Sequence, residues 1–390
     1  MKGFPGMFPS EGASTPESWP LKLDSGAPGS LVGWYDRNRR DLPWRKTRDP
    51  YRIWVSEIML QQTTVSTVLR YFDRFIKRFS TLENLSNASL SEVLKLWEGL
   101  GYYQRARNLH RAAGMIPVGP GGPDWPRTVS EWMVLPGIGR STAGAILSIS
   151  TDTWAPILDA NVRRVMERFY SIPPDVRARE KLLWEGSNLW GRDNGRPGDT
   201  NQALMELGAV ICLPSGPDCS RCPVFLQCRT RGPGVGAKEE GFRGKKGKGE
   251  TQEKPIRERV ALIPESGPLL LEPRNEGRLL EGLMDFPGFS SSAPAPGTVI
   301  VSGSFRGARV VETLFTVRQT YSHFQEVVYV TLIAPSGRKR RKVEVSLSFS
   351  ENERETGQWV SIEESASLAL TGVARKIIDR LRSGKIPGRD

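Results

Sequence analysis

The sequence LPGIGRSTAG at residues 135–144 predicts a specific local structure within this chain. Pro136 and Gly137 predict a tight turn, and we expect a helix on either side of it. The glycines would let the backbone approach a phosphate, and the amides of Gly137, Gly139 and the following helix start would face an anion favoured by the helix dipole. An ordinary turn between two helices explains the same residues, so both interpretations stand at this point.

The chain on both sides of this turn has a helical pattern from about residue 31 to residue 228. Residues 117–126, rich in Pro and Gly, predict a surface loop within it. The apolar residues before that loop recur at spacings that build one face of a helix: Trp54, Ile58, Val65, Val68, Leu69, Phe72 and Ile76.

The composition divides the chain into four parts. Residues 1–29 read as a disordered leader, 30–228 as the helical domain, and 229–256 as a flexible linker, while 257–390 form a second domain. Beyond the linker the apolar residues fall in short β-rich runs at 298–301, 327–332 and 343–347. The last two runs predict a hairpin, and 374–381 predicts a closing helix. We therefore expect a mainly α protein with a smaller α+β second domain.

The charge balance favours a polyanionic partner. The 43.4 kDa chain carries a net charge of +12 and has a pI near 9.7, which suits nucleic acid first, although a basic surface can also serve an anionic membrane. No apolar run is long enough to span a bilayer, and nothing resembles a signal peptide. These features predict a cytoplasmic protein in a reducing compartment, without a membrane role.

All four cysteines fall within one short segment, with the spacing C-x6-C-x2-C-x5-C. Such grouping predicts a metal site rather than a disulfide framework. The spacing favours an iron-sulfur cluster, whereas a four-thiolate zinc site usually pairs two short C-x2-C steps, of which this chain has one. Both metals remain open from spacing alone. The four residues are Cys212, Cys219, Cys222 and Cys228.

Two carboxylates lie in segments that suggest chemistry. Glu57 sits in the apolar sequence PYRIWVSEIMLQQT at residues 50–63, where a solvated or salt-bridged glutamate is the ordinary alternative. Asp159 precedes a predicted helix in PILDANVRRV at residues 156–165, where a helix N-cap is the ordinary role. An N-cap and a catalytic carboxylate are compatible roles for one residue.

Residues 201–209, NQALMELGA, lead directly into Cys212, and this segment resembles the one before the [4Fe-4S] loop of MutY-type adenine DNA glycosylases. Residues 135–144 likewise match the helix-hairpin-helix motif of that superfamily. The resemblance implies a two-lobed helix-hairpin-helix glycosylase domain with a [4Fe-4S] loop and a smaller Nudix-like C-terminal domain. It implies a monomeric base-excision repair enzyme, nucleoid-associated if the source is prokaryotic, that removes adenine mispaired with 8-oxoguanine or guanine in double-stranded DNA.

The resemblance also assigns roles to residues of the helical domain. Glu57 would protonate the adenine leaving group, which requires a raised pKa, Asp159 would face the sugar, and Asn161 would orient these groups. Residues 212–228 would hold the cluster through the four cysteines. The positions that match the family's adenine pocket are Trp44, Arg45, Leu60, Gln202 and Met205.

The expected DNA contacts lie in several segments. Gln62 and Tyr102 match positions where the family inserts side chains beside the mispair, although a lone Tyr on a helix is more often a core residue. Thr63 and Leu100 would contact the opposite base. Ser141 stands where bifunctional members that resemble endonuclease III have a lysine, so we expect base removal without an efficient lyase step.

In the second domain, residues 279–288 and 321–324 resemble the two recognisable signatures of the MutY C-terminal domain. Met284 and Asp285 replace the Trp-Glu common in the family. No Nudix box follows, so we expect recognition and not hydrolysis of a diphosphate. Tyr321, Ser322 and His323 would read 8-oxoguanine, although a satisfied histidine at a strand end remains the alternative.

Two other functions are alternatives to adenine removal. One is a bifunctional pyrimidine glycosylase/lyase, which Ser141 and the long second domain oppose. The other is a catalytically silent iron-sulfur protein that only binds damaged DNA, and such a protein would have no need of both Glu57 and Asp159.

Overall fold

The structure is a computed structural model, and it describes residues 21–191, 195–231, 254–265, 267–274, 280, 283–289, 293–296, 298–300, 305, 308–321, 324–334 and 357–384. The chain divides into two compact units. The first comprises residues 1–77, 81–83 and 111–247, and the second comprises residues 78–80, 84–110 and 248–390. Most of the predicted linker, residues 232–253, lies outside the described residues.

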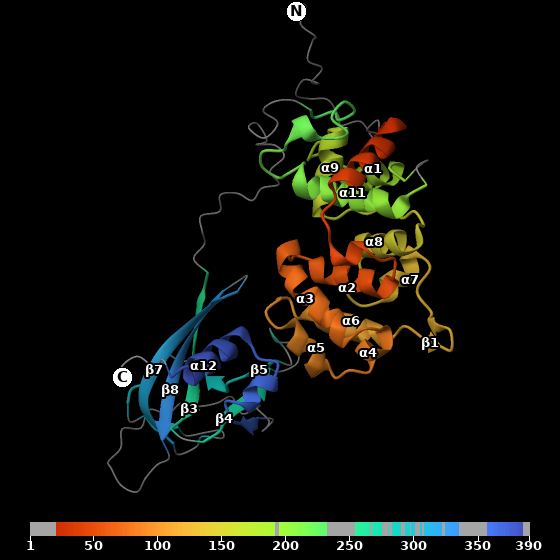
Figure 1. Cartoon of the computed structure of the whole chain (residues 1–390). Helices are drawn as coiled ribbons and strands as arrows, with labels where there is room; N and C mark the ends of the chain where they lie inside the picture. The colour runs from red at the N-terminus through yellow and green to blue at the C-terminus, as the bar shows by residue number, and fades with distance from the viewer. Residues whose placement is uncertain are drawn as a thin grey trace, which may run out of the picture. The chain divides into compact units, whose positions relative to one another are not determined.

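The part of the chain before the linker is helical, as predicted (Figure 1). A two-residue β-pair, β1 (Val118–Gly119) with β2 (Gly122–Pro123), forms within the predicted loop. The helices are α1 (Gly26–Asn38), η1 (Pro43–Arg45), α2 (Pro50–Leu60), α3 (Val65–Arg78), α4 (Leu82–Ser86), α5 (Leu90–Trp97), α6 (Gln104–Ala113), α7 (Val129–Val134), α8 (Arg140–Thr151), α9 (Ala160–Tyr170), α10 (Arg179–Leu189), α11 (Pro197–Val210) and η2 (Cys219–Arg221).

Local sequence explains where several helices begin. Asp49 caps α2 by accepting from the Tyr51 amide at 3.0 Å, and Pro50 occupies the first position, where its missing N–H costs nothing.

Helix α1 begins at Gly26, so the predicted start of the folded domain at residue 30 was four residues late. The Asp24 carboxylate accepts from the Gly26 amide at 2.7 Å, and Ala27 is buried, which extends the helix toward the N-terminus.

Helix α11 is central to the first unit, because it packs against α1, α8 and α9. Helix α8 also packs against α2. A glycine permits a close approach on α8, since a Cβ at Gly144 would lie 2.6 Å from the Pro156 carbonyl oxygen. Helix α2 and helix α9 therefore pack against two helices that contact each other, α2 against α8 and α9 against α11.

Beyond the linker, the described residues of the second unit form two sheets and one α-helix, the α+β composition that the sequence predicts. One sheet has the order β6-β3-β8-β7, with β3 parallel to β8 and the other pairs antiparallel, and the other has the order β5-β4-β9. The elements are β3 (Ile256–Pro264), β4 (Leu269–Pro273), β5 (Met284–Asp285), β6 (Gly288–Phe289), β7 (Arg309–Thr320), β8 (Gln325–Ala334), β9 (Gln358–Val360), η4 (Glu364–Ser367) and α12 (Gly372–Arg382).

One predicted pairing is wrong. Strand β8 is bonded along one edge to β3 and along the other to β7, so residues 327–332 cannot form a hairpin with 343–347. The partner of β8 in its hairpin is β7, and the turn between them is residues 321–324. The second run, 343–347, and the basic run at 338–342 lie outside the described residues.

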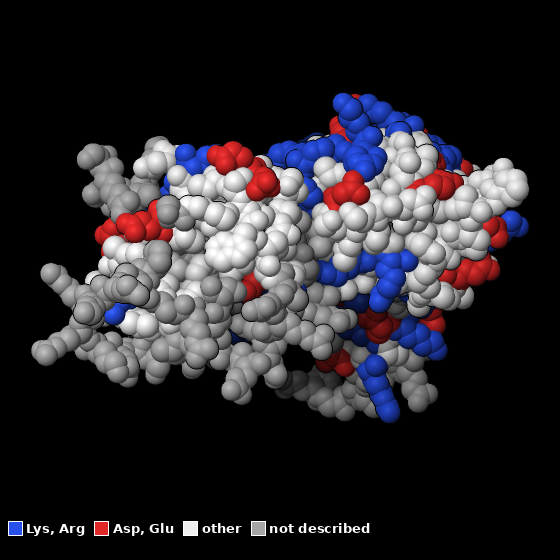
Figure 2. Space-filling view, turned by 90° about the horizontal axis from the view of Figure 1, so that it is seen from below, with Lys and Arg blue, Asp and Glu red and all other residues white. Residues whose placement is uncertain are grey.

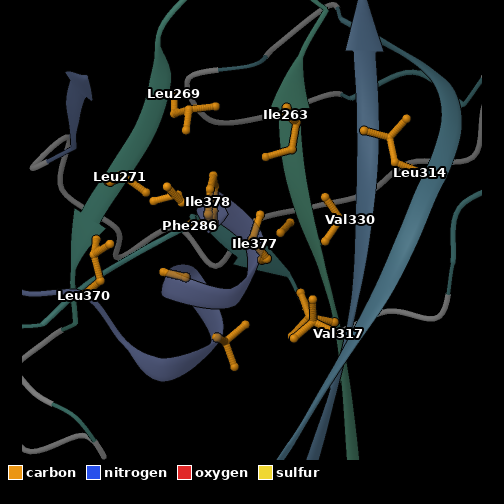
Figure 3. Packing of buried hydrophobic residues seen from close by; sticks show 14 of the residues in the cluster. Ile263, Leu269, Leu271, Phe286, Leu314, Val317, Val330, Leu370, Ile377 and Ile378 are labelled. Carbon is orange, nitrogen blue, oxygen red and sulfur yellow. The ribbon is translucent and has the colours of Figure 1, made fainter. Parts of the chain in front are cut away.

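Helix α12 covers the core of this unit, as the apolar pattern at 374–381 predicts. Figure 3 shows Ile377 and Ile378 of α12 among side chains of the strands, including Leu271 and Val330. Burial of such aliphatic side chains stabilises a fold by about 1.5–3 kcal/mol each. The cluster is therefore sufficient to give the second unit a core of its own.

Residues 84–110, which the sequence places in the helical domain, lie in the second unit. Arg375 of α12 donates to both oxygens of Glu98, at 2.7 and 2.9 Å, and Lys95 donates to the Leu368 carbonyl at 2.8 Å. These contacts explain the assignment of α5 to this unit.

Candidate active site

The predicted hairpin is present as α7, a turn and α8. Leu135 to Ile138 form the turn, in which the Ile138 amide donates to the Leu135 carbonyl at 3.3 Å and Gly137 has a φ of 82°. Pro before a glycine with positive φ is the sequence preference of a type II turn. Gly139 is the N-cap of α8. Because the first amides of a helix have no partner within it, this end of α8 can face an anion.

Ser141 joins this hairpin to the segment that precedes Asp159. The Ser141 hydroxyl accepts a hydrogen bond from the Leu158 amide at 2.9 Å. Asp159 is the next residue, and its carboxylate caps α9 by accepting from the Val162 amide at 2.7 Å. The N-cap role is therefore confirmed. Burial raises the pKa of Asp159, and the amides of Val162 and Asn161 oppose that rise.

Glu57 lies on α2 and is partly buried. Burial and the nearby charge of Asp159 raise the pKa of Glu57 to about 7, while Arg45 lowers it. Within the described part of the chain, the Glu57 carboxylate forms no ion pair, so burial decides its protonation. A carboxyl group with this pKa can hold a proton near neutral pH and deliver it to a leaving group.

Arg45 is held by an acid that the sequence analysis missed. Glu206 on α11 is completely buried and accepts from Arg45 at 2.8 Å and from Arg40 at 2.7 and 2.8 Å. Burial would raise the pKa of Glu206, but the hydrogen bonds from Arg40 and Arg45 outweigh it and lower the pKa to about 2. The sequence does contain a signal for Glu206, because it is a single acid within an apolar stretch of a predicted helix.

The other predicted adenine-pocket residues come from the same elements as Glu57, Arg45 and Glu206. Trp44 on η1 is buried, with its ring edge-on to Phe72 at a centroid distance of 5.2 Å. Leu60 ends α2, and Gln202 and Met205 lie on α11 just before Glu206. The fold thus presents the predicted residues on η1, α2 and α11.

Asn161 is connected to the cysteine segment through Arg164, another residue that the sequence analysis missed. Arg164 donates to the Asn161 side-chain oxygen at 2.9 Å, to the Gly208 carbonyl at 2.6 Å and to the Cys212 carbonyl at 2.7 Å. A Cβ at Gly208 would lie 2.7 Å from the Asn161 Cβ, so a glycine is needed at this contact between α9 and α11.

The four cysteines line one cavity, together with Arg168, Ile211 and Phe225 among other residues. Burial raises the pKa of Cys222 to about 12 and that of Cys228 to about 11, and the neighbouring cysteines add to both shifts. A bound cationic group would reverse these shifts, because it stabilises thiolates. The donor set therefore fits a thiolate-bound metal group. Among the described residues, no three potential ligands are already arranged around a single ion.

The two residues predicted to insert beside a mispair share an unusual backbone conformation. Gln62 has a φ of 55° and Tyr102 a φ of 50°, although neither is a glycine. Such backbone strain persists only where the surroundings impose it, and it is frequent at functional sites. Tyr102 is 53% exposed, which excludes the core alternative, and the Arg105 guanidinium lies 5.4 Å from its ring.

Thr63 is partly exposed beside Gln62, whereas Leu100 is buried, with only 5% of the residue exposed. His110 packs against the chain, with its Nε2 atom 2.9 Å from the Ala88 carbonyl oxygen. In the second unit Tyr321 directly follows β7, and Ser322 and His323 lie outside the described residues.

The surface charge agrees with the basic composition of the chain. Figure 2 shows one face on which Lys and Arg side chains form several patches with Asp and Glu between them. The positive charge on this face is spread over patches and is not gathered at one point. No helix in the described residues is long and apolar enough to cross a membrane.

Both domains of the chain match families of known proteins. Residues 55–188 match the HhH-GPD superfamily of base excision DNA repair proteins, and residues 259–380 match the NUDIX domain. The fold and site thus define a helix-hairpin-helix base-excision DNA repair protein with a NUDIX-type second domain.

The adenine DNA glycosylase of Buchnera aphidicola subsp. Schizaphis graminum is 33% identical over 359 residues, which cover 90% of this chain and 96% of that protein. The human adenine DNA glycosylase is 45% identical over 217 residues, 52% of this chain and 39% of the human protein. A solved thermostable thymine-DNA glycosylase is 31% identical, with a TM-score of 0.47, over 52% of this chain and 94% of that one. The chain belongs to the adenine DNA glycosylase family, whose members are hydrolases of N-glycosyl bonds.

Proposed function

We propose that this chain removes adenine paired with 8-oxoguanine or guanine in double-stranded DNA, as a monomer and without an efficient lyase step. The observation that carries the proposal is the pair of carboxyl groups on α2 and at the start of α9. Glu57 has a pKa raised to about 7, and Asp159 is close enough to contribute to that rise. Two carboxyl groups with separate roles are the usual solution for cleaving a glycosidic bond.

The chemistry follows from these two groups. Glu57 donates its proton to N7 of the extruded adenine, and the C1′–N9 bond breaks as its electron pair moves to the base. Asp159 stabilises the oxocarbenium-like sugar or briefly bonds to C1′. Water then adds to C1′ and releases its proton to the Glu57 carboxylate, so the acid is regenerated.

The base must leave the duplex before Glu57 can reach it. Tyr102 and Gln62 support this step, because both have a constrained backbone and are exposed. A planar exposed ring can stack on the bases that border the gap. We assign the reading of the opposite base to Thr63, Leu100 and the segment 321–323.

Ser141 supports the absence of a lyase step. A lyase needs an amine to attack C1′ and form a Schiff base, and Ser141 has none. Its hydroxyl instead accepts from the Leu158 amide, next to Asp159. The serine therefore has a positioning role for the segment that carries the catalytic aspartate.

The four cysteines would hold a [4Fe-4S] cluster, which supplies a rigid centre for residues 212–228. The supporting observations are the shared cavity and the contact of Arg168 with this segment, in which it donates to the Cys212 sulfur at 3.4 Å and to the Leu213 carbonyl at 2.6 Å. Iron and sulfide analysis of the purified chain tests this assignment, and stoichiometric zinc without sulfide would contradict it.

A single-turnover assay tests the whole proposal. An end-labelled duplex with one A:8-oxoguanine pair is treated with the cluster-loaded chain, and each sample is read with and without hot alkali. Scission that appears only after alkali supports monofunctional base removal. Scission without alkali would favour the bifunctional lyase, and intact strands in both samples would favour a protein that only binds DNA.

A further inference from the structure

The turn between β7 and β8 is fixed at both of its ends. The Tyr321 amide donates to the Phe324 carbonyl at 2.9 Å, and the two rings stack with centroids 4.7 Å apart at an interplanar angle of 29°. Arg257 lies over the Phe324 ring at 4.1 Å, and Lys254 donates to the Tyr321 carbonyl at 2.8 Å. Tyr321 and Phe324, the described residues between β7 and β8, are therefore held in place by these contacts.

A charged cluster lies at the base of this turn. Arg259 donates to Glu326 at 2.8 Å and to both oxygens of Asp285 at 3.0 Å. Arg274 donates to Asp285 at 2.6 and 3.0 Å. Two arginines thus balance two acids, and Asp285 and Glu326 are only 3% and 6% exposed. Such a compensated set is rigid, because moving any member would leave a buried charge without its partner.

Tyr321 connects the cluster to the turn. Its hydroxyl donates to the second oxygen of Glu326 at 3.1 Å, while the first oxygen accepts from Arg259. Burial, followed by the charge of Glu326, raises the pKa of Tyr321, so the hydroxyl remains a donor at neutral pH. A hydrogen bond to a charged acceptor is stronger than one between neutral groups and orients the ring that forms it.

We infer that Glu326 is a positioning residue for recognition of the base opposite adenine, and that it acts by fixing the Tyr321 side chain through the hydroxyl of that tyrosine. This inference rests on the proposed function, in which residues 321–323 read that base. Residues that orient a recognition group from behind contribute to specificity without touching the ligand. Glu326 therefore affects the choice between 8-oxoguanine and guanine, and not the cleavage of the glycosidic bond.

The test is a double-mutant cycle on the full, cluster-loaded chain. The variants are Tyr321→Phe, Glu326→Ala and the double substitution, and the control is Tyr329→Phe. Tyr329 lies on the same strand and donates to Glu258 at 2.7 Å, so its substitution removes the same kind of hydrogen bond away from the turn. Dissociation constants are measured for A:8-oxoguanine and A:guanine duplexes whose adenine nucleotide carries a 2′-fluoro group that blocks hydrolysis.

We expect Tyr321→Phe to lower the ratio of the two dissociation constants about fivefold, and Tyr329→Phe to leave it unchanged. Glu326→Ala should lower the ratio as well, but no further in the Tyr321→Phe background. Thermal unfolding of the same samples identifies a variant that fails to fold. If Glu326→Ala does not fold, the comparison of Tyr321→Phe with Tyr329→Phe decides the question.

The possible outcomes separate the inference from the proposed function. A wild-type chain that binds both duplexes equally would overturn the proposed lesion preference, and the inference with it. A wild-type preference that Tyr321→Phe retains in full would overturn the inference alone. Equal losses in Tyr321→Phe and Tyr329→Phe, or additive losses in the double variant, would also overturn it, because the effect would then come from the sheet in general.

Discussion

Two regions of the molecule place buried acids in opposite electrostatic surroundings. On α2, Glu57 is partly buried without an ion-pair partner among the described residues, and its pKa rises to about 7. In the second unit, Asp285 and Glu326 are more deeply buried, but Arg259 and Arg274 balance them. Burial without a counter-charge raises the pKa of an acid so that it can hold a proton, whereas a buried acid that is hydrogen-bonded to arginines is held in one position and orients its neighbours.

Glu206 shows that the distinction depends on partners and not on the domain. It lies in the first unit near Arg45, is more buried than Glu57, and has a pKa lowered to about 2 because Arg40 and Arg45 bind it. The first unit thus contains both a proton donor, Glu57, and a permanent anion, Glu206. The two acids differ because different charged side chains surround them. Four substitutions test whether neighbouring charges control these acids.

The largest effect is expected for Glu57→Gln. Removal of the general acid should slow single-turnover base removal by about 10²–10⁴-fold, while binding to the A:8-oxoguanine duplex is largely retained. Because the folded pKa is raised from 4.5 to about 7, the stability that protonated Glu57 contributes is complete below 4.5 and is lost as pH rises through about 7. The variant should therefore gain stability relative to the wild type over that range. Full activity, or loss of binding, would contradict its role.

Asp285→Asn should have the opposite effect on stability. It leaves Arg259 and Arg274 with one carboxylate between them, which should destabilise the second unit by about 3–5 kcal/mol in denaturant unfolding. The matched control is Asp379→Asn, because Asp379 forms an exposed pair with Arg382 at 4.0 Å. That substitution should cost less than about 1 kcal/mol. Equal costs would show that the buried cluster is not compensated as described.

Arg45→Met should shift the pH dependence of base removal. The wild-type single-turnover rate should fall as pH rises through about 7, because Glu57 must be protonated. Arg45 lowers the pKa of Glu57, so its removal should move the midpoint of this fall to higher pH. Arg40→Met is the control, since Arg40 binds Glu206 but is not among the charges that shift Glu57. A midpoint that moves to lower pH would contradict this account.

The smallest effect is expected for Ser141→Ala. The Leu158 amide would lose its acceptor, which should cost about 1 kcal/mol and slow single-turnover base removal by less than about tenfold. Ser150→Ala is the control and should leave the rate unchanged, because the Ser150 hydroxyl donates to the Ile146 and Leu147 carbonyls of its own helix. Strand scission without alkali should not appear in either variant. A wild-type rate for Ser141→Ala would show that the hydrogen bond does not position Asp159.

Local sequence was sufficient for much of the fold. The turn at 135–138, the N-cap at Asp159 and the helix α12 follow from residue types at short spacing, and the structure contains all three. The pairing of β8 was predicted wrongly. Residues 327–332 are apolar on both faces of the strand, so their pattern does not reveal which strands lie beside it. Pairing is set by the whole sheet, in which β3 and β7 already occupy both edges.

Sequence alone therefore determined the helical class of the first domain, the grouping of four cysteines, and the presence of Glu57, Asp159 and Ser141. Tertiary structure decided what these residues can do. It buried Glu57 with no ion-pair partner among the described residues, placed Arg40 and Arg45 on Glu206, and brought Arg259 and Arg274 to Asp285. A carboxyl group's protonation state depends on solvent exclusion and on charges distant in sequence, and only the folded chain fixes both.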